Sequence, residues 1–188
     1  MEVDNFIYKK FIDKNICDEL INYYEKSSNK FRGTFGNDAT EDPTFKQSTE
    51  ITFTEEDGII FNKYMEQLNT VCEAYKHKYV YADIQQQPWG WIGSKIQKYE
   101  PNEGYHIWHA ENEGSPASLN RHLVFMTYLN DVSEGGETGF FYQDKKIKPE
   151  KGLTLMWPVA WTHTHKGYAS PNESKYIVTG WYGYLQND

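Results

Sequence analysis

Hydrophobic residues recur at helical spacing in two segments of the first 80 residues. The first segment follows Asp13, a residue type that caps helix N-termini, and its one-sided stripe consists of Ile16, Leu20, Ile21 and Tyr24. The second begins near Thr54, with Asp57 three residues later as a partial capping box, and its stripe consists of Ile60, Tyr64, Leu68, Val71 and Tyr75. Residues 31–48 between the two are predicted to form a long loop, and residues 50–53 a strand.

After Tyr81 the hydrophobic positions alternate, which is typical of strands. Turn-forming residues such as Gly135-Gly136 and Ser170-Pro171-Asn172 separate the alternating segments. Many short strands at regular intervals predict a sandwich, barrel or jelly roll, with the earlier helices supporting one face. The predicted strands are residues 93–99, 105–111, 121–129, 139–143, 153–157, 163–165 and 175–185.

The length of 188 residues suits a single domain, 1–188. Within it we expect a helical support and loop at 1–80 and a β-rich core at 81–188. The two cysteines, Cys17 and Cys72, lie in apolar helical segments and are expected to be buried free thiols.

The net charge of −8 comes without a Lys/Arg-rich run, so we expect no nucleic-acid partner. No apolar run approaches the length of a transmembrane helix, and the acidic N-terminus has no signal-peptide pattern. These features predict a cytoplasmic protein without a membrane partner.

Candidate metal ligands occur in two short motifs. On a strand, the side chains of His109 and Glu111 would point to the same face, because side chains alternate with a period of two. A second histidine from another strand would complete a set of two imidazoles and one carboxylate, which suits non-haem Fe(II) and oxygen chemistry. Both His163 and His165 are candidates; we favour His165, because Gly167 shortly after it lets the backbone turn away. His106 would face away from His109, and an exposed strand without metal is the alternative for the whole motif.

The strand at 175–185 carries a candidate anion site. Lys175 shares its face with Ile177, Thr179 and Trp181, and a lysine in such apolar company can bind the carboxylate of a small acid. The alternative is a lysine at the strand edge with its ammonium group in water. The phenol groups of Tyr99 and Tyr128 could donate hydrogen bonds to the same carboxylate, although either tyrosine alone would suit the core.

Residues 97–185 resemble the catalytic core of the Fe(II)- and 2-oxoglutarate-dependent dioxygenases, in the prolyl 4-hydroxylase-like family. The resemblance covers about half of the chain, and the motifs occur in the family's order. They are Lys98-Tyr99-Glu100-Pro101, Trp108-His109-Ala110-Glu111-Asn112, Tyr128-Leu129-Asn130-Asp131, Gly135-Gly136-Glu137-Thr138, Pro158 to His165-Lys166-Gly167, and Lys175-Tyr176-Ile177-Val178-Thr179-Gly180-Trp181. The implied fold is α+β, mainly β: a double-stranded β-helix, or jelly roll, with N-terminal supporting helices.

The resemblance also implies roles for individual residues. His109, Glu111 and His165 would bind Fe(II), and Lys175 would bind the distal carboxylate of the cosubstrate 2-oxoglutarate. Cosubstrate contacts are further expected from Tyr99, Tyr128 and Thr179, and substrate contacts from Arg121, Trp181 and Trp108. The sequence departs from the commoner family motif at Glu111, where relatives more often have Asp.

The implied activity is hydroxylation of a C–H bond with release of succinate and CO2, and ascorbate is a further cofactor that the resemblance suggests. The family favours prolyl residues in a peptide or protein. An extended proline-containing segment fits an aromatic groove, which residues 31–48 could build together with Trp89, Trp91, Trp108, Trp161 and Trp181. The alternatives are the same chemistry on a free amino acid or other small molecule, and a non-catalytic cupin-like or lectin-like binding module.

Overall fold

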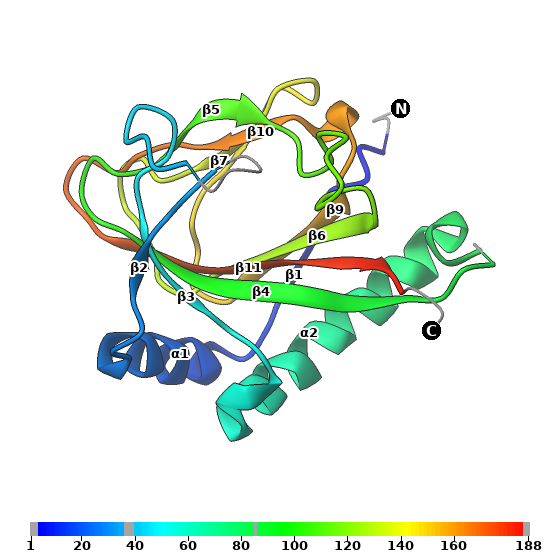
Figure 1. Cartoon of the computed structure of the whole chain (residues 1–188), viewed down its shortest axis with the longest axis horizontal. Coiled ribbons are helices and arrows are strands. Elements are labelled where there is room, and N and C mark those ends of the chain that lie inside the picture. Colours follow the sequence, from blue (N-terminus) through cyan, green and yellow to red (C-terminus); the bar gives the residue numbers. More distant parts are fainter. Residues whose placement is uncertain (1–3, 36–39, 85, 186–188) are drawn as a thin grey trace.

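The computed structural model describes residues 4–35, 40–84 and 86–185. Its strands form two antiparallel sheets that face each other, which is the predicted jelly roll (Figure 1). In spatial order, the seven-stranded sheet contains β1 (Tyr8–Phe11), β9 (Leu153–Pro158), β6 (Arg121–Tyr128), β11 (Lys175–Tyr184), β4 (Trp89–Tyr99), β3 (Thr49–Thr52) and β2 (Phe31–Arg32). The four-stranded sheet contains β5 (Tyr105–His109), β10 (His165–Gly167), β7 (Thr138–Phe140) and β8 (Lys145–Ile147).

Two helices, α1 (Lys14–Lys26) and α2 (Ile59–Lys78), cover the outer face of the larger sheet (Figure 1). The Asp13 side chain caps α1 as predicted, by accepting a hydrogen bond from the Asn15 amide. The capping box of Thr54 and Asp57 also forms, but it begins the 3₁₀ turn η1 (Glu55–Asp57), and α2 starts only after Gly58. No helix in the described part of the chain is both long and apolar enough to cross a membrane.

Alternation along the strands divides the buried side chains into two cores. One core packs the helices against the sheet, with Leu20 and Leu68 facing Ile96 and Val178. The other lies between the sheets and includes Val124, Leu155, Trp157 and Ile177. Because successive side chains of a strand point to opposite faces, residues next to each other in β4, β6 and β11 supply different cores. Polar side chains on the strand faces that carry the second core therefore point into the space between the two sheets.

Cys17 and Cys72 are buried free thiols, as predicted. Burial raises the pKa of each thiol to about 11, so both stay protonated at neutral pH. Cys17 belongs to α1 and Cys72 to α2, and both contribute to the core beneath the larger sheet.

The structure corrects several predicted strand boundaries. The first 80 residues supply three strands to the larger sheet, and β1, β2 and β8 have no counterpart among the predicted strands. β1 pairs with β9 at one edge, and β8 pairs with β7 in the smaller sheet. Short edge strands of three or four residues give too little alternation to be recognised in a sequence. The predicted loop 31–48 contains β2, and its residues 36–39 lie outside the described residues.

Candidate active site

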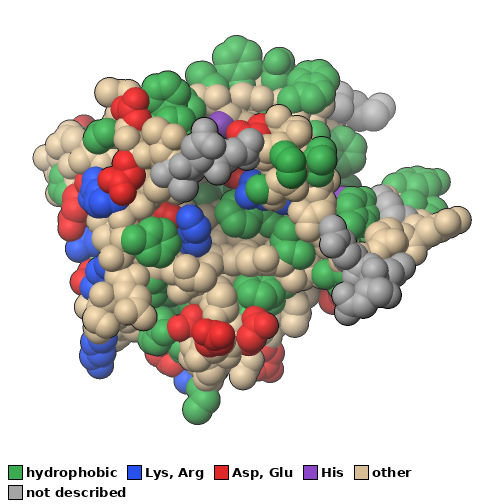
Figure 2. All heavy atoms as spheres, in the orientation of Figure 1, with side chains coloured by type: hydrophobic (Ala, Val, Ile, Leu, Met, Phe, Trp, Pro, Cys, Tyr) green, Lys and Arg blue, Asp and Glu red, His purple; other side chains and the backbone are tan. Residues whose placement is uncertain are grey.

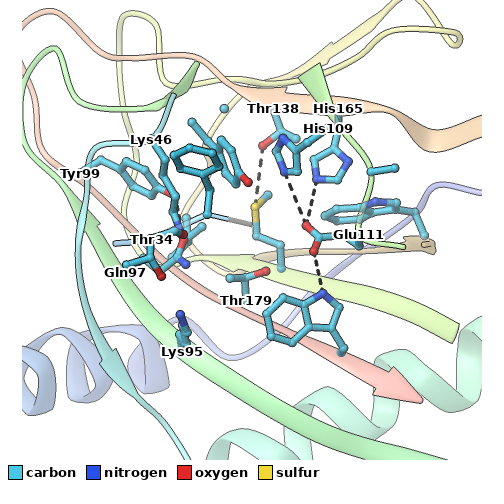
Figure 3. A pocket seen from close by; sticks show the side chains of 18 of the residues that line it. Thr34, Lys46, Lys95, Gln97, Tyr99, His109, Glu111, Thr138, His165 and Thr179 are labelled. Atoms are coloured by element: carbon cyan, nitrogen blue, oxygen red, sulfur yellow. Dashed lines mark hydrogen bonds and ion pairs between the residues drawn. The ribbon is translucent and has the colours of Figure 1, made fainter. Parts of the chain in front are cut away.

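A cavity of about 210 Å³ lies between the two sheets. On the face of the molecule shown in Figure 2, the surface is hollowed between the sheets, and acidic and basic side chains lie around the hollow. The inward-facing residues of β4, β5, β10 and β11 line the cavity, together with Thr34, Phe35 and Lys46 from the segment before β3. Figure 3 shows how these side chains converge.

Three of the lining side chains form a cluster with the geometry of a metal site. One ligand atom from each of His109, Glu111 and His165 lies within 4.8 Å of the other two. The Glu111 Oε1 atom is 3.6 Å from His109 Nε2 and 3.4 Å from His165 Nε2. Bonds of about 2.0–2.2 Å to a common metal ion would put neighbouring ligand atoms roughly 3 Å apart, so a small inward movement suffices. The donor set of two imidazoles and one carboxylate is one that Fe(II) accepts.

Backbone carbonyls fix the orientation of both imidazole rings. His109 Nδ1 lies 3.1 Å from the Ile107 carbonyl, and His165 Nδ1 lies 2.9 Å from the His163 carbonyl. A carbonyl can only accept, so each Nδ1 donates to its carbonyl, and each Nε2 faces Glu111 and is the atom that would bind a metal once it is unprotonated. Burial lowers the pKa of His109, which favours the neutral ring that ligation requires. These contacts prepare both rings to bind a metal.

Glu111 reaches the cluster from beyond the end of a strand. The expectation that His109 and Glu111 share a strand face is wrong, because β5 ends at His109. The Trp181 indole N–H donates to Glu111 Oε2 at 2.8 Å, and Arg121 donates to the Glu111 carbonyl at 2.7 Å and lies 3.4 Å from Oε2. Burial disfavours the carboxylate, but the hydrogen bonds and charges of the two histidines outweigh it and hold the pKa of Glu111 well below its usual range.

This arrangement accounts for a glutamate at this position. The longer side chain spans from the loop after β5 back to the two rings. Trp181 and Arg121 hold Oε2, so Oε1 faces the two histidines. The Arg121 guanidinium also stacks on the Trp181 ring at 4.0 Å. Both residues line the cavity, as expected for substrate-contacting residues, and both also orient Glu111.

The two candidate histidines near β10 have different environments. His163 is not in a strand, contrary to the prediction for 163–165; it ends the 3₁₀ turn η3 (Trp161–His163). Its ring is buried against Thr162 Oγ1 and the Asn5 carbonyl, each at 3.0 Å. His165 begins β10 and pairs directly with His109 across the smaller sheet. The preference for His165 as the partner of His109 and Glu111 therefore agrees with the geometry.

Lys175 is a buried cation without a buried anion. Its side chain is 3% exposed, and Nζ donates to the carbonyls of Gly136 at 3.0 Å and Tyr168 at 3.1 Å. An ammonium group has three N–H donors, so one remains for a ligand. No carboxylate within the described ranges forms an ion pair with it, and burial lowers its pKa to about 8. Burying a charge in this way is costly, so a carboxylate ligand in the cavity would relieve it.

The other expected cosubstrate residues have distinct positions. Tyr99 lines the cavity with its ring 4.9 Å from Lys175 Nζ, but its hydroxyl donates to Gln97 Oε1 at 2.7 Å. Thr179 also lines the cavity and donates to the Phe125 carbonyl. Tyr128 does not line the cavity: its buried hydroxyl lies 2.6 Å from Thr138 Oγ1 and 3.1 Å from the Ile147 carbonyl. It therefore supports Thr138, which does line the cavity.

The residues of the expected aromatic groove do not come together at the cavity. Of its five tryptophans, only Trp181 lines the cavity. Trp89 and Trp91 pack on the helix side of the larger sheet, Trp91 with its ring 5.2 Å from that of Phe61. Trp108 is 39% exposed beside Phe141, and Trp161 is 66% exposed beside Tyr142. Trp108 points away from the cavity because it alternates with the inward-facing His109.

Several cavity residues are absent from the set predicted from the sequence. The Tyr105 ring stacks on the His109 ring at 3.7 Å and an interplanar angle of 15°. Lys95 and Gln97 share strand parity with Tyr99, so alternation along β4 could have identified them. Lys46 comes from the segment before β3, where no periodic pattern exists, and only the tertiary contacts reveal it.

Comparison with known proteins agrees with this geometry. Residues 94–183 match the model of the 2OG-Fe(II) oxygenase superfamily. No curated protein matches the sequence at a significant level. Among solved structures, the viral collagen prolyl hydroxylase of Paramecium bursaria Chlorella virus-1, in its 2OG complex, is 22% identical with a TM-score of 0.74 over 96% of this chain and 97% of that one.

Two further structures show the same fold. A prolyl hydroxylase from Trichoplax adhaerens, in complex with a hypoxia inducible factor peptide fragment, is 18% identical with a TM-score of 0.75 over 95% of this chain and 84% of that one. A Pseudomonas putida prolyl-4-hydroxylase is 11% identical with a TM-score of 0.72 over 95% and 92%. The family match and the His-Glu-His cluster identify residues 94–183 as a 2-oxoglutarate- and Fe(II)-dependent dioxygenase region of the 2OG-Fe(II) oxygenase superfamily, and the chain has a prolyl 4-hydroxylase-like fold.

Proposed function

We propose that this dioxygenase hydroxylates prolyl residues in a peptide or protein, with release of succinate and CO2. The observation that carries the proposal is a single cavity that contains both the His109, Glu111 and His165 cluster and the buried, unpaired Lys175. The similar structures described above are prolyl hydroxylases, and one contains a peptide. They support a prolyl substrate for this chain.

The chain's own residues have separable tasks in this reaction. When bound, Fe(II) and 2-oxoglutarate supply the oxidising power for C–H hydroxylation. His109 and His165 would hold the metal through Nε2, and Glu111 would hold it through Oε1, while the Trp181 indole N–H binds Oε2. Lys175 would bind the distal carboxylate of 2-oxoglutarate, and the Tyr99 ring lies 4.9 Å from its Nζ atom.

Two glycines let the backbone approach Lys175. Gly136 has a φ of 73°, and its carbonyl accepts a hydrogen bond from Lys175 Nζ. A Cβ atom at Gly167 would lie 3.7 Å from Nζ, in the space that a carboxylate ligand needs. The Gly135-Gly136 turn and Gly167 thus shape the cosubstrate end of the cavity.

Turnover with proline-containing peptides tests the proposed function. We expect succinate formation from 2-oxoglutarate with Fe(II) and ascorbate to rise with a proline-rich peptide. The peptide should gain one oxygen atom at proline by mass spectrometry. The matched control is the same peptide with alanine at each proline, which should leave succinate at its basal rate. Equal stimulation by both peptides, or stimulation by free proline alone, would contradict a prolyl peptide substrate.

The pKa of Lys175 predicts how cosubstrate binding depends on pH. Burial lowers this pKa to about 8, so the free enzyme loses the positive charge as pH rises through 8. Affinity for 2-oxoglutarate should be nearly constant below that pH and should fall by at most about tenfold per pH unit above it. Equilibrium binding under anaerobic conditions, with Mn(II) in place of Fe(II), measures this directly. An affinity that rises between pH 8 and 9 would show that Lys175 does not control binding.

A further inference from the structure

A second charged cluster lies in the same cavity, away from the proposed metal ligands. Figure 3 shows Lys46, Lys95 and Gln97 on one side of the cavity and the His-Glu-His cluster on the other. Lys46 Nζ is 2.6 Å from Glu50 Oε1, and Lys95 Nζ is 2.9 Å from Glu50 Oε2. Two cations therefore share one carboxylate. Glu50 is fully buried, and the Lys46 side chain is only 6% exposed.

The charges lining this cavity leave an excess of positive charge at the cluster. Arg121 pairs with Glu111 at the metal end, and Lys175 has the distal carboxylate of 2-oxoglutarate as its expected partner. Lys46 and Lys95 face the cavity, but Glu50 neutralises only one of them. Glu113, the remaining acidic residue that lines the cavity, lies in the loop after β5, close in sequence to the metal ligand Glu111. The chain as a whole has a net charge of −8, so the excess of positive charge at this cluster does not follow from its overall composition.

The neighbouring Gln97 presents a hydrogen-bond donor in the same region. Its Oε1 accepts from the Tyr99 hydroxyl at 2.7 Å, so its amide nitrogen lies on the other side of the group. Gln97 and Lys95 both line the cavity and share strand parity on β4. A carboxylate bound beside Lys95 would meet an ammonium group and an amide donor, which is a favourable charge-assisted arrangement.

We propose that Lys95, with Lys46 and Gln97, forms a subsite for a carboxylate of the substrate. This rests on the proposed function, because it concerns the substrate of the same cavity. The carboxylate can belong to an acidic residue near the target proline or to a free amino acid. Lys95 is the accessible member, with a side chain 27% exposed. Glu50 holds it by an ion pair, and Lys46 shares that carboxylate.

Two variants with opposite expected effects test the subsite. Lys95→Gln removes the accessible cation but leaves Glu50 paired with Lys46 and Ser48. Glu50→Gln removes the shared anion and adds one net positive charge to the cluster. For each variant we would measure kcat/KM for a proline peptide with a neighbouring Asp and for the same peptide with Asn. The ratio of the two values within one variant cancels any loss of folded enzyme.

Wild-type enzyme should prefer the Asp peptide by about tenfold or more, as expected for a hydrogen bond between charged groups. Lys95→Gln should reduce the ratio to about one, and Glu50→Gln should raise it above the wild-type value. Lys98→Gln is the matched control: Lys98 lies on the same strand with a side chain 20% exposed, but it pairs with Glu25 and Glu100 on the other face. It should leave the ratio unchanged. The KM for 2-oxoglutarate should stay the same in all three variants.

The outcomes separate this inference from the proposed function. A wild-type ratio of one, or a ratio that both Lys95→Gln and Glu50→Gln lower, would overturn the carboxylate subsite while prolyl turnover stands. The enzyme could hydroxylate free proline and neither peptide. In that case, a higher KM for proline in Lys95→Gln would show that the bound carboxylate belongs to a free amino acid. The same result without that effect overturns the subsite. If Lys95→Gln raises the KM for 2-oxoglutarate instead, the cluster serves the cosubstrate and the proposal is wrong.

Discussion

Replacing His165 with Ala is expected to abolish both metal binding and succinate formation, whereas His163→Ala is expected to keep both. His165 Nε2 lies 3.4 Å from Glu111 Oε1, and its other nitrogen is held by the His163 carbonyl. That carbonyl is a backbone atom, so it remains in the His163→Ala variant. Even outer contacts to metal ligands change affinity or activity by about 10–100-fold, so loss of a ligand should exceed about 100-fold.

The His163 variant should instead lose stability. Its buried ring contacts Thr162 and the Asn5 carbonyl. Truncation to Ala removes both hydrogen bonds and leaves a small cavity. We expect a decrease of about 1–3 kcal/mol in the free energy of unfolding. Metal content, succinate formation and chemical denaturation measured on both variants check the pair. Retained iron in His165→Ala together with lost iron in His163→Ala would reverse the assignment.

Lys175→Met should raise the KM for 2-oxoglutarate by at least about 30-fold and leave the metal in place. The substitution removes the only described cation at the cosubstrate end of the cavity that lacks an acidic partner, while the apolar side chain fills similar space. Truncating one partner of a buried charged pair costs about 2–5 kcal/mol, which sets this lower bound. Lys175 has no contact with the three metal ligands in the described structure, so Mn(II) affinity without cosubstrate should be unchanged.

Lys166→Met is the matched control for this variant. Lys166 lies near Lys175 in the fold, on β10, but its ammonium group sits over the Trp108 ring at 4.9 Å, outside the cavity. It should keep the wild-type KM for 2-oxoglutarate. An equal increase in the KM for 2-oxoglutarate in both variants would indicate a general effect of lost positive charge. Loss of metal from Lys175→Met would show that the role assigned to Lys175 is wrong.

Local patterns in the sequence were sufficient for much of the fold. The helical stripes identified α1 and α2, because burial on one side of a helix leaves a 3.6-residue period. Alternation identified the long strands β4, β6 and β11, and strand parity placed Ile177, Thr179 and Trp181 with Lys175 on one face, where they all line the cavity. The metal cluster was recognisable because its three residues occur in family motifs with a fixed order.

The remaining features depend on contacts between residues far apart in the chain. Sequence periodicity shows which face of an element is buried, but not which other element covers it. The dispersal of the tryptophans, the position of Tyr128 behind Thr138 and the approach of Lys46 to Glu50 all follow from how the sheets pack. Likewise, Glu111 lies outside any strand, and Trp181 and Arg121 orient it from β11 and β6. The sequence thus determined the identity of the reacting groups, whereas the packing of two sheets determined their geometry, because only tertiary contacts bring such distant side chains together.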